Sequence, residues 1–155
     1  MKAYLVEDDP LKAAKLRDFV ENRYGLALQT FGSYQSGLRA IQTDPPELVL
    51  MDMTLPTFDR AAHAREGRSR PLGGYDLMRK MKLRGSSSKV IVVTQLDNFG
   101  DGDDLVTFEE ITLTCWREFP DFFLGSVHFR QNAVEWQLGL STLMDSLKND
   151  KDSAS

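Results

Sequence analysis

The sequence predicts a single α/β domain in which a five-stranded parallel sheet carries helices on both faces. Apolar runs at Ala3–Val6, Leu48–Met51 and Val90–Val93 have the pattern of strands that are buried on both sides. Segments with helical spacing separate these runs, as in βαβ units. The length of 155 residues suits one domain with a sizeable core.

The first helix is expected to begin at Asp9 and Pro10, because aspartate can cap a helix and proline suits its first turn. Its apolar edge consists of Leu16, Phe19 and Val20, and its water-facing edge of Lys12, Lys15 and Arg17. The fourth strand is expected to cover Lys89–Thr94, around the run Val90–Val93, and the two remaining strands are Leu26–Phe31 and Phe122–Phe129, the last interrupted by Gly125. The other expected helices are Ser33 to near Gln42, Gly74–Leu83, Thr107–Phe119 and Ala133–Lys148. Residues 1–148 form the predicted domain, and residues 149–155 a polar tail.

Three of the expected strands run into polar residues of different kinds. Glu7 and Asp8 follow the first strand, Asp52 follows the third, and Thr94 ends the fourth. In a parallel sheet these endings share the edge at which open α/β sheets place their chemistry. A group of carboxylates next to a hydroxyl indicates a site for the transfer of a phosphoryl group to one of the carboxylates.

Two connections that follow these strands are long and carry opposite charges. Residues 57–72 form a basic insertion with four arginines and His63 against two acidic residues, and residues 97–104 contain four aspartates and no base. Both exceed the usual connection of about four to six residues.

The composition argues against several classes of protein. A net charge of −4 without a sustained basic stripe disfavours direct binding to nucleic acid. The single cysteine, Cys115, can form neither an intrachain disulfide nor a multi-cysteine metal site. No apolar run approaches the roughly 18 residues of a membrane span. We therefore expect a cytoplasmic protein that does not associate with membranes.

Four segments in this order resemble the receiver domains of two-component response regulators. Residues 5–10 (LVEDDP) are similar to the family's first-strand acidic motif, and residues 48–56 (LVLMDMTLP) to its phosphoacceptor segment. Residues 74–78 (GYDLM) are similar to the start of its third helix, and residues 90–94 (VIVVT) to its fourth strand. Their joint occurrence is specific, although each motif alone is weak. The resemblance implies the flavodoxin-like, doubly wound fold with strand order 2-1-3-4-5.

The resemblance also implies a reaction. A phosphoryl group passes from the phosphohistidine of a sensor histidine kinase or a phosphotransfer protein to the nucleophile Asp52. Mg²⁺ relieves the repulsion between the carboxylate and the anionic phosphoryl group. Its expected ligands are Asp8 and Asp52 directly, Glu7 through water, and the backbone carbonyl of Thr54.

Signalling in the family depends on groups beyond the acidic cluster. The resemblance implies that Thr94 donates its hydroxyl to a phosphoryl oxygen and couples phosphorylation to the rotation of an aromatic residue, here Phe122 or Phe123. The family also has a lysine on the fifth strand that pairs with the phosphoryl group. Residues 122–129 (FFLGSVHF) contain no lysine, which is the main departure from the family pattern.

The charged connections suggest a hypothesis for this departure. They would emerge side by side above Asp52 and could pair as a latch. An arginine of the insertion, Arg65 or Arg68, could then replace the lysine, because guanidinium is suited to phosphate oxygens. The alternative is that both connections are solvated and take no part in the chemistry, since surface ion pairs contribute little.

The preferred interpretation is a stand-alone receiver that is phosphorylated on Asp52 and signals to a downstream protein through contacts. Its enzymatic activity would be at most self-phosphorylation and autodephosphorylation, and formation of a homodimer stays open. A pseudo-receiver that signals by binding alone is the alternative, favoured by the missing lysine and opposed by the intact acidic site. An aspartate-nucleophile phosphatase is less favoured, because Thr54 cannot replace the second aspartate that performs acid/base catalysis in such enzymes.

Overall fold

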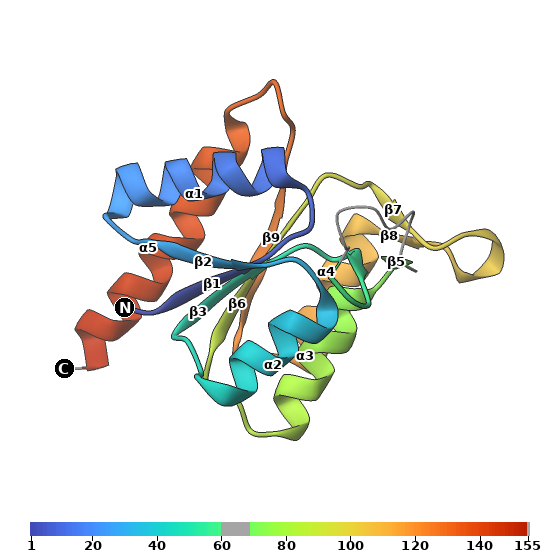
Figure 1. Ribbon diagram of the computed structural model, residues 1–155, viewed down its shortest axis with the longest axis horizontal. Coiled ribbons are helices and arrows are strands. Elements are labelled where there is room, and N and C mark those ends of the chain that lie inside the picture. Colours follow the sequence, from blue (N-terminus) through green and yellow to red (C-terminus); the bar gives the residue numbers. More distant parts are fainter. Residues whose placement is uncertain (60–68, 155) are drawn as a thin grey trace.

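The computed structural model describes residues 1–59 and 69–154, with side chains as far as Lys148. Five strands form one parallel sheet in the order β2-β1-β3-β6-β9 (Figure 1). Their bounds are Ala3–Val6 for β1, Leu28–Phe31 for β2, Leu48–Met51 for β3, Lys89–Thr94 for β6 and Phe123–His128 for β9. Counted along the chain, this is the order 2-1-3-4-5, so the predicted flavodoxin-like fold is confirmed.

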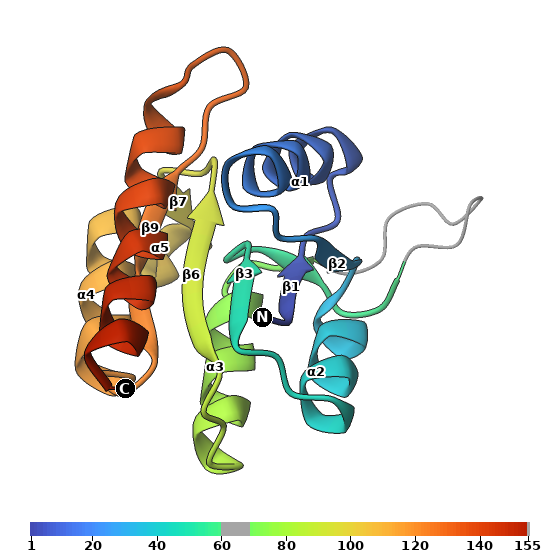
Figure 2. The same cartoon turned by 90° about the vertical axis from the view of Figure 1, so that its left-hand side faces the viewer.

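Helices cover both faces of this sheet (Figure 2). On one face lie α1 (Pro10–Tyr24) and α5 (Glu135–Ala154). On the other lie α2 (Tyr34–Thr43), α3 (Gly73–Leu83) and α4 (Phe108–Glu118). The Asp9 side chain caps α1 by accepting hydrogen bonds from the backbone N–H groups of its first turn, as the sequence predicts.

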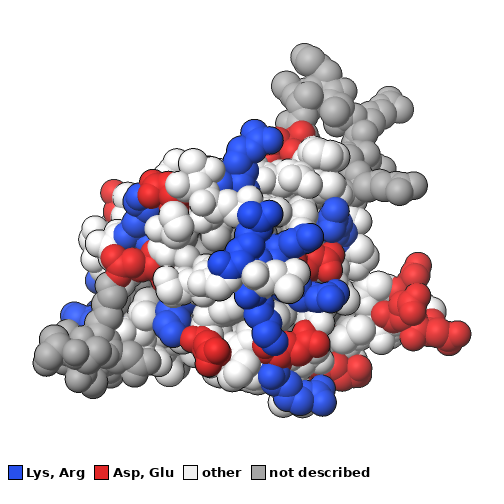
Figure 3. Space-filling model, turned by 90° about the horizontal axis from the view of Figure 1, so that it is seen from below, with Lys and Arg blue, Asp and Glu red and all other residues white. Residues whose placement is uncertain are grey.

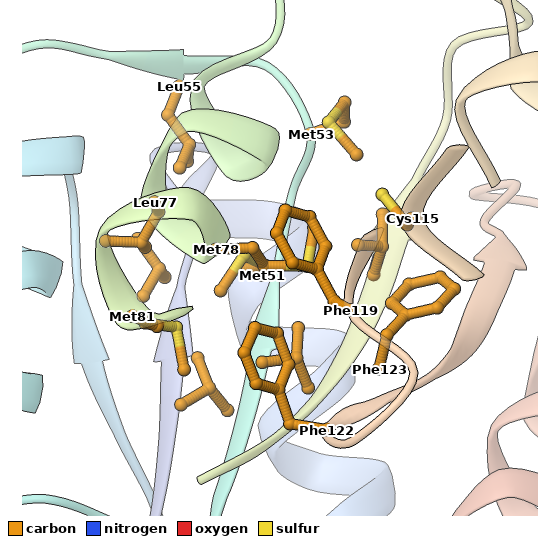
Figure 4. Packing of buried hydrophobic residues seen from close by; sticks show 14 of the residues in the cluster. Met51, Met53, Leu55, Leu77, Met78, Met81, Cys115, Phe119, Phe122 and Phe123 are labelled. Carbon is orange, nitrogen blue, oxygen red and sulfur yellow. The ribbon is translucent and has the colours of Figure 1, made fainter. Parts of the chain in front are cut away.

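The sheet separates two apolar cores. Successive strand residues point to opposite faces, so Leu48 and Leu50 enter the core beneath α1 and α5. Val49 and Met51 enter the core beneath α2, α3 and α4, part of which Figure 4 shows. All four side chains are fully buried, as expected for a continuous apolar run in the middle of a doubly covered sheet.

Two small hairpins interrupt the alternation of strands and helices. In the first, β4 (Leu55–Pro56) pairs antiparallel with β5 (Ser69–Arg70) and closes the base of the basic insertion. In the second, β7 (Asn98–Phe99) pairs with β8 (Val106–Thr107), and the 3₁₀ helix η1 (Gly102–Asp104) lies between them. The aspartate-rich connection therefore forms a hairpin that contains a short 3₁₀ helix.

The last strand contains an irregularity that the sequence signalled at Gly125. In the pairing of β6 with β9, Val90 lies opposite Phe123 and Ile91 lies opposite Gly125. Leu124 is thus the extra residue of a bulge. Gly125 has a φ of +152°, a conformation that glycine adopts far more readily than other residues.

Candidate functional site

The carboxyl edge of the sheet brings the predicted acidic residues together. Glu7, Asp8 and Asp52 each place a carboxylate oxygen within 4.8 Å of the others. Glu7 and Asp52 are buried, at 3% and 6% exposure. Thr94 is also buried and ends β6, the strand next to β3. The sequence rule that parallel strand ends share one edge thus located the cluster correctly.

Backbone contacts fix the position of Asp52. Its N–H donates to the carbonyl of Val6 at 3.1 Å, and its Oδ1 accepts from the N–H of Met53 at 2.7 Å. The start of α3 presses against the same segment, because the N–H of Gly74 donates to the carbonyl of Met53 at 2.8 Å. A Cβ atom on Gly74 would lie only 2.6 Å from the backbone oxygen of Asp52, so this close approach requires glycine.

The prediction that Lys12 lies on the water-facing edge of α1 is wrong. Its side chain is fully buried, and its Nζ lies 2.6 Å from Glu7 Oε1 and 3.1 Å from Asp52 Oδ2. The ammonium also donates to the backbone carbonyl of Val93 at 2.7 Å. The sequence held a signal for this position, because Lys12 precedes Leu16 by four residues and so lies on the same face of α1.

Burial and charge act on Glu7 in opposite directions. The pKa of Glu7 is raised from 4.5 to about 7: burial is the main cause, the Asp52 charge raises the pKa further, and the Lys12 ammonium lowers it. A buried carboxylate of this kind is stabilised in its ionised form by nearby cations. The cluster therefore favours positive charge in its immediate surroundings.

The two predicted threonines both follow the acidic residues in the chain, Thr54 two positions after Asp52 and Thr94 at the end of β6. Thr94 Oγ1 accepts a hydrogen bond from the N–H of Leu96 at 3.3 Å, and a hydroxyl that accepts in this way keeps its own proton for donation. Thr54 Oγ1 donates to the carbonyl of Pro71 at 2.9 Å, which connects the segment after Asp52 to the start of α3.

The switch candidates Phe122 and Phe123 lie at the opposite end of β9 from Thr94. Phe123 is opposite Val90, whereas His128 is opposite Thr94. Both phenylalanines are buried in the core beneath α3 and α4 (Figure 4).

At the level of Thr94, the residue on β9 is His128. Its Nε2 lies 2.9 Å from Asp97 Oδ1, and its ring meets that of Phe108 edge-on at 5.6 Å. Sequence reasoning did not single out His128 for the site, because the bulge at Leu124 shifts the register of β9.

Nothing on β9 reproduces the family's lysine. Ser126, in the middle of β9, accepts a hydrogen bond at Oγ from the Thr112 hydroxyl of α4 at 3.0 Å. Arg65 and Arg68, the candidate replacements, and His63 lie outside the described residues.

The described ends of the two charged connections lie side by side. A cavity of about 560 Å³ has Arg70 and Asp104 in its lining. The Arg70 guanidinium lies 4.1 Å from the centre of the Tyr34 ring and 3.4 Å from Asp76. Figure 3, a view from the side of α2 and α3, shows Lys and Arg gathered across this face and acidic residues at the edge where the second hairpin projects.

Fold and site together define a signalling domain of the aspartate-centred receiver type, and comparisons with known proteins agree. The family described as the response regulator receiver domain matches residues 3–106. The Detocs response regulatory protein DtcB of Enterobacter cloacae is 30% identical over 144 residues, covering 90% of this chain and 95% of the relative. The uncharacterized protein y4jR of Sinorhizobium fredii is 27% identical over 150 residues, which cover 95% of this chain and 99% of y4jR. The chain therefore belongs to the receiver domain family of two-component response regulators.

Solved structures support the fold. The response regulator receiver domain protein from Clostridium thermocellum matches with a TM-score of 0.64 at 19% identity, over 99% of this chain and 98% of that one. The receiver domain of the Francisella response regulator 1452 matches with a TM-score of 0.56 at 16% identity, over 94% and 98%. Within the described residues, none of the helices combines the length and apolar character needed to cross a membrane.

Proposed function

We propose that this protein is a stand-alone receiver that accepts a phosphoryl group on Asp52 from the phosphohistidine of a histidine kinase or phosphotransfer protein. It would then signal to a downstream protein through contacts. The observation that carries this proposal is the convergence of Glu7, Asp8 and Asp52 within 4.8 Å at the sheet edge beside Thr94. Action without an attached output domain is supported by y4jR and DtcB, which the match covers over 99% and 95% of their own lengths.

The donor set fits Mg²⁺, which prefers oxygen ligands and is commonly bound through one or two carboxylates. Three carboxylates and one ammonium give the site a formal charge of −2, which a divalent cation balances. Asp8 and Asp52 would hold the ion directly, with Glu7 acting through water and Thr54 through its backbone carbonyl. When bound, the ion neutralises charge between the attacking carboxylate and the phosphoryl group.

The chain's own residues account for the remaining steps. A carboxylate oxygen of Asp52 forms a bond to phosphorus while the bond from phosphorus to the histidine nitrogen breaks, and the imidazole leaves with the electron pair. The hydrogen bond from Met53 to Oδ1 holds the carboxylate in one orientation for this attack. The Thr94 hydroxyl would donate to a phosphoryl oxygen, which adds a charge-assisted hydrogen bond.

The proposal is tested by incubating the protein with Mg²⁺ and acetyl phosphate and recording its intact mass. We expect one phosphoryl adduct on the wild type and none on Asp52→Asn. Asp97→Asn is the matched control, because Asp97 follows the neighbouring strand but lies outside the carboxylate cluster, and it should be phosphorylated normally. An unmodified wild type would favour the pseudo-receiver, and repeated hydrolysis of phosphomonoesters would favour the phosphatase.

A further inference from the structure

The most unusual feature of the site is a buried lysine that comes from a helix. Lys12 is 0% exposed, although lysine is almost never fully buried without a partner. Three oxygen atoms surround its Nζ, one each from Glu7, Asp52 and Val93. An ammonium group has three hydrogen-bond donors, so these three oxygen atoms together fix the position of the Lys12 charge.

That point lies between the residues that perform the chemistry. The three oxygen atoms belong to the carboxyl ends of β1, β3 and β6, and Val93 immediately precedes Thr94. The ring of Phe129, directly after β9, lies 5.9 Å from the ammonium. The residue directly after β9 thus places an aromatic ring beside the ammonium.

We propose that Lys12 of α1 supplies the cation that pairs with the phosphoryl group on Asp52, in place of the missing fifth-strand lysine. This inference rests on the proposed function. When an oxygen of Asp52 bonds to phosphorus and the bond to the donor breaks, negative charge gathers on the phosphoryl oxygens next to the carboxylate. An ammonium already 3.1 Å from Asp52 Oδ2 lies next to that charge, and a phosphoryl oxygen would take the place of one of its three present oxygen contacts.

The same position makes Lys12 a neighbour of the metal site. Its positive charge lowers the negative charge of the carboxylates that would bind Mg²⁺. Removing it has two consequences of opposite sign: Mg²⁺ is bound more tightly, because repulsion is relieved, and phosphoryl transfer becomes slower. A lysine that only supported the fold would not produce this pair of effects.

Lys12→Met tests the proposal, because methionine keeps an unbranched chain and removes the charge. The matched control is Lys15→Met, three residues further along α1, where the side chain is exposed and its Nζ donates to the carbonyl of Gln131. The rate of phosphorylation by acetyl phosphate is followed by intact mass, and Mg²⁺ affinity by calorimetry. We expect phosphorylation of Lys12→Met to fall on the order of 100-fold and Mg²⁺ to bind about tenfold more tightly, with Lys15→Met unchanged.

A phosphorylated wild type with an equally active Lys12→Met would overturn the role of Lys12 and leave the proposed function intact. A folded Lys12→Met that loses both phosphorylation and Mg²⁺ binding would also overturn it, since that result indicates a structural role. A wild type that is never phosphorylated rejects the proposed function, and the inference with it.

If Lys12→Met fails to fold, a crystal structure of the wild type with Mg²⁺ and beryllofluoride decides. A fluorine within about 3.2 Å of Lys12 Nζ supports the proposal, and an arginine of the insertion in that place refutes it.

Discussion

The junction between β3 and α3 permits a sharp test, because the same substitution should have opposite effects at two helical glycines. In Gly74→Ala, the new Cβ would lie 2.6 Å from the backbone oxygen of Asp52 and 3.1 Å from the Cα of Met53. Both are backbone atoms, so the strand end and the helix must move apart. Such overpacking costs about 1–3 kcal/mol, and alanine recovers about 0.4–1 kcal/mol through the unfolded chain. We expect a net loss of about 1–2 kcal/mol in the free energy of unfolding.

Gly139→Ala in α5 is the matched control. The nearest atom to its Cβ would be Val127 Cγ1 at 3.8 Å, an ordinary contact, so we expect a gain of about 0.4–1 kcal/mol. Urea unfolding followed by tryptophan fluorescence measures both values, and the melting temperature should fall by about 2–8 °C for Gly74→Ala. Movement of Asp52 should also slow phosphorylation of this variant. Equal stabilisation by the two alanines would refute the close approach of α3 to the site.

Two further predictions concern the cores. Leu140→Ala should lower the free energy of unfolding by about 2–5 kcal/mol, because Leu140 is fully buried. Leu138→Ala should change it by less than about 0.5 kcal/mol, because Leu138 is 74% exposed. Similar losses for the two variants in urea unfolding would contradict the orientation of α5. Burial raises the pKa of the Cys115 thiol from 9.0 to about 12, so iodoacetamide at about pH 8 should label only the unfolded protein. The thiol of the unfolded protein loses its proton at lower pH than the buried thiol, so the free energy of unfolding should fall as the pH rises from 9.0 towards about 12. The free energy of unfolding of Cys115→Ala should fall less steeply over that range.

Local sequence patterns were sufficient to predict the sheet and the acidic cluster. The run Leu48–Met51 is apolar at every position, so it can only be a strand covered on both faces or a buried helix, and its length favours the strand. Once it is a parallel strand, Asp52 must lie at the edge of the sheet that also holds Glu7 and Asp8. This inference uses chain direction alone and needs no knowledge of packing.

Lys12 could not be placed in the same way. A lysine on a helix is usually solvated, and its burial here depends on carboxylates from two different strands, one of them 40 positions further along the chain at Asp52. The register of β9 could not be predicted either, because one extra residue at Leu124 changes which side chain of β9 lies opposite Thr94. Net charge does not show where charges gather either, since Lys and Arg cluster near the middle of the face in Figure 3 although the chain has a total charge of −4.

The origin of the site's charged groups has a consequence for how this protein can diversify. Glu7, Asp8, Lys12 and Asp52 all come from residues 1–52, and the family match ends at residue 106. The family's lysine lies on the fifth strand. If Lys12 supplies that cation here, β9 can change its sequence without loss of a reactive group. Exchanging residues after 106 between relatives such as DtcB and this protein could therefore redirect partner choice while leaving the reactive groups untouched.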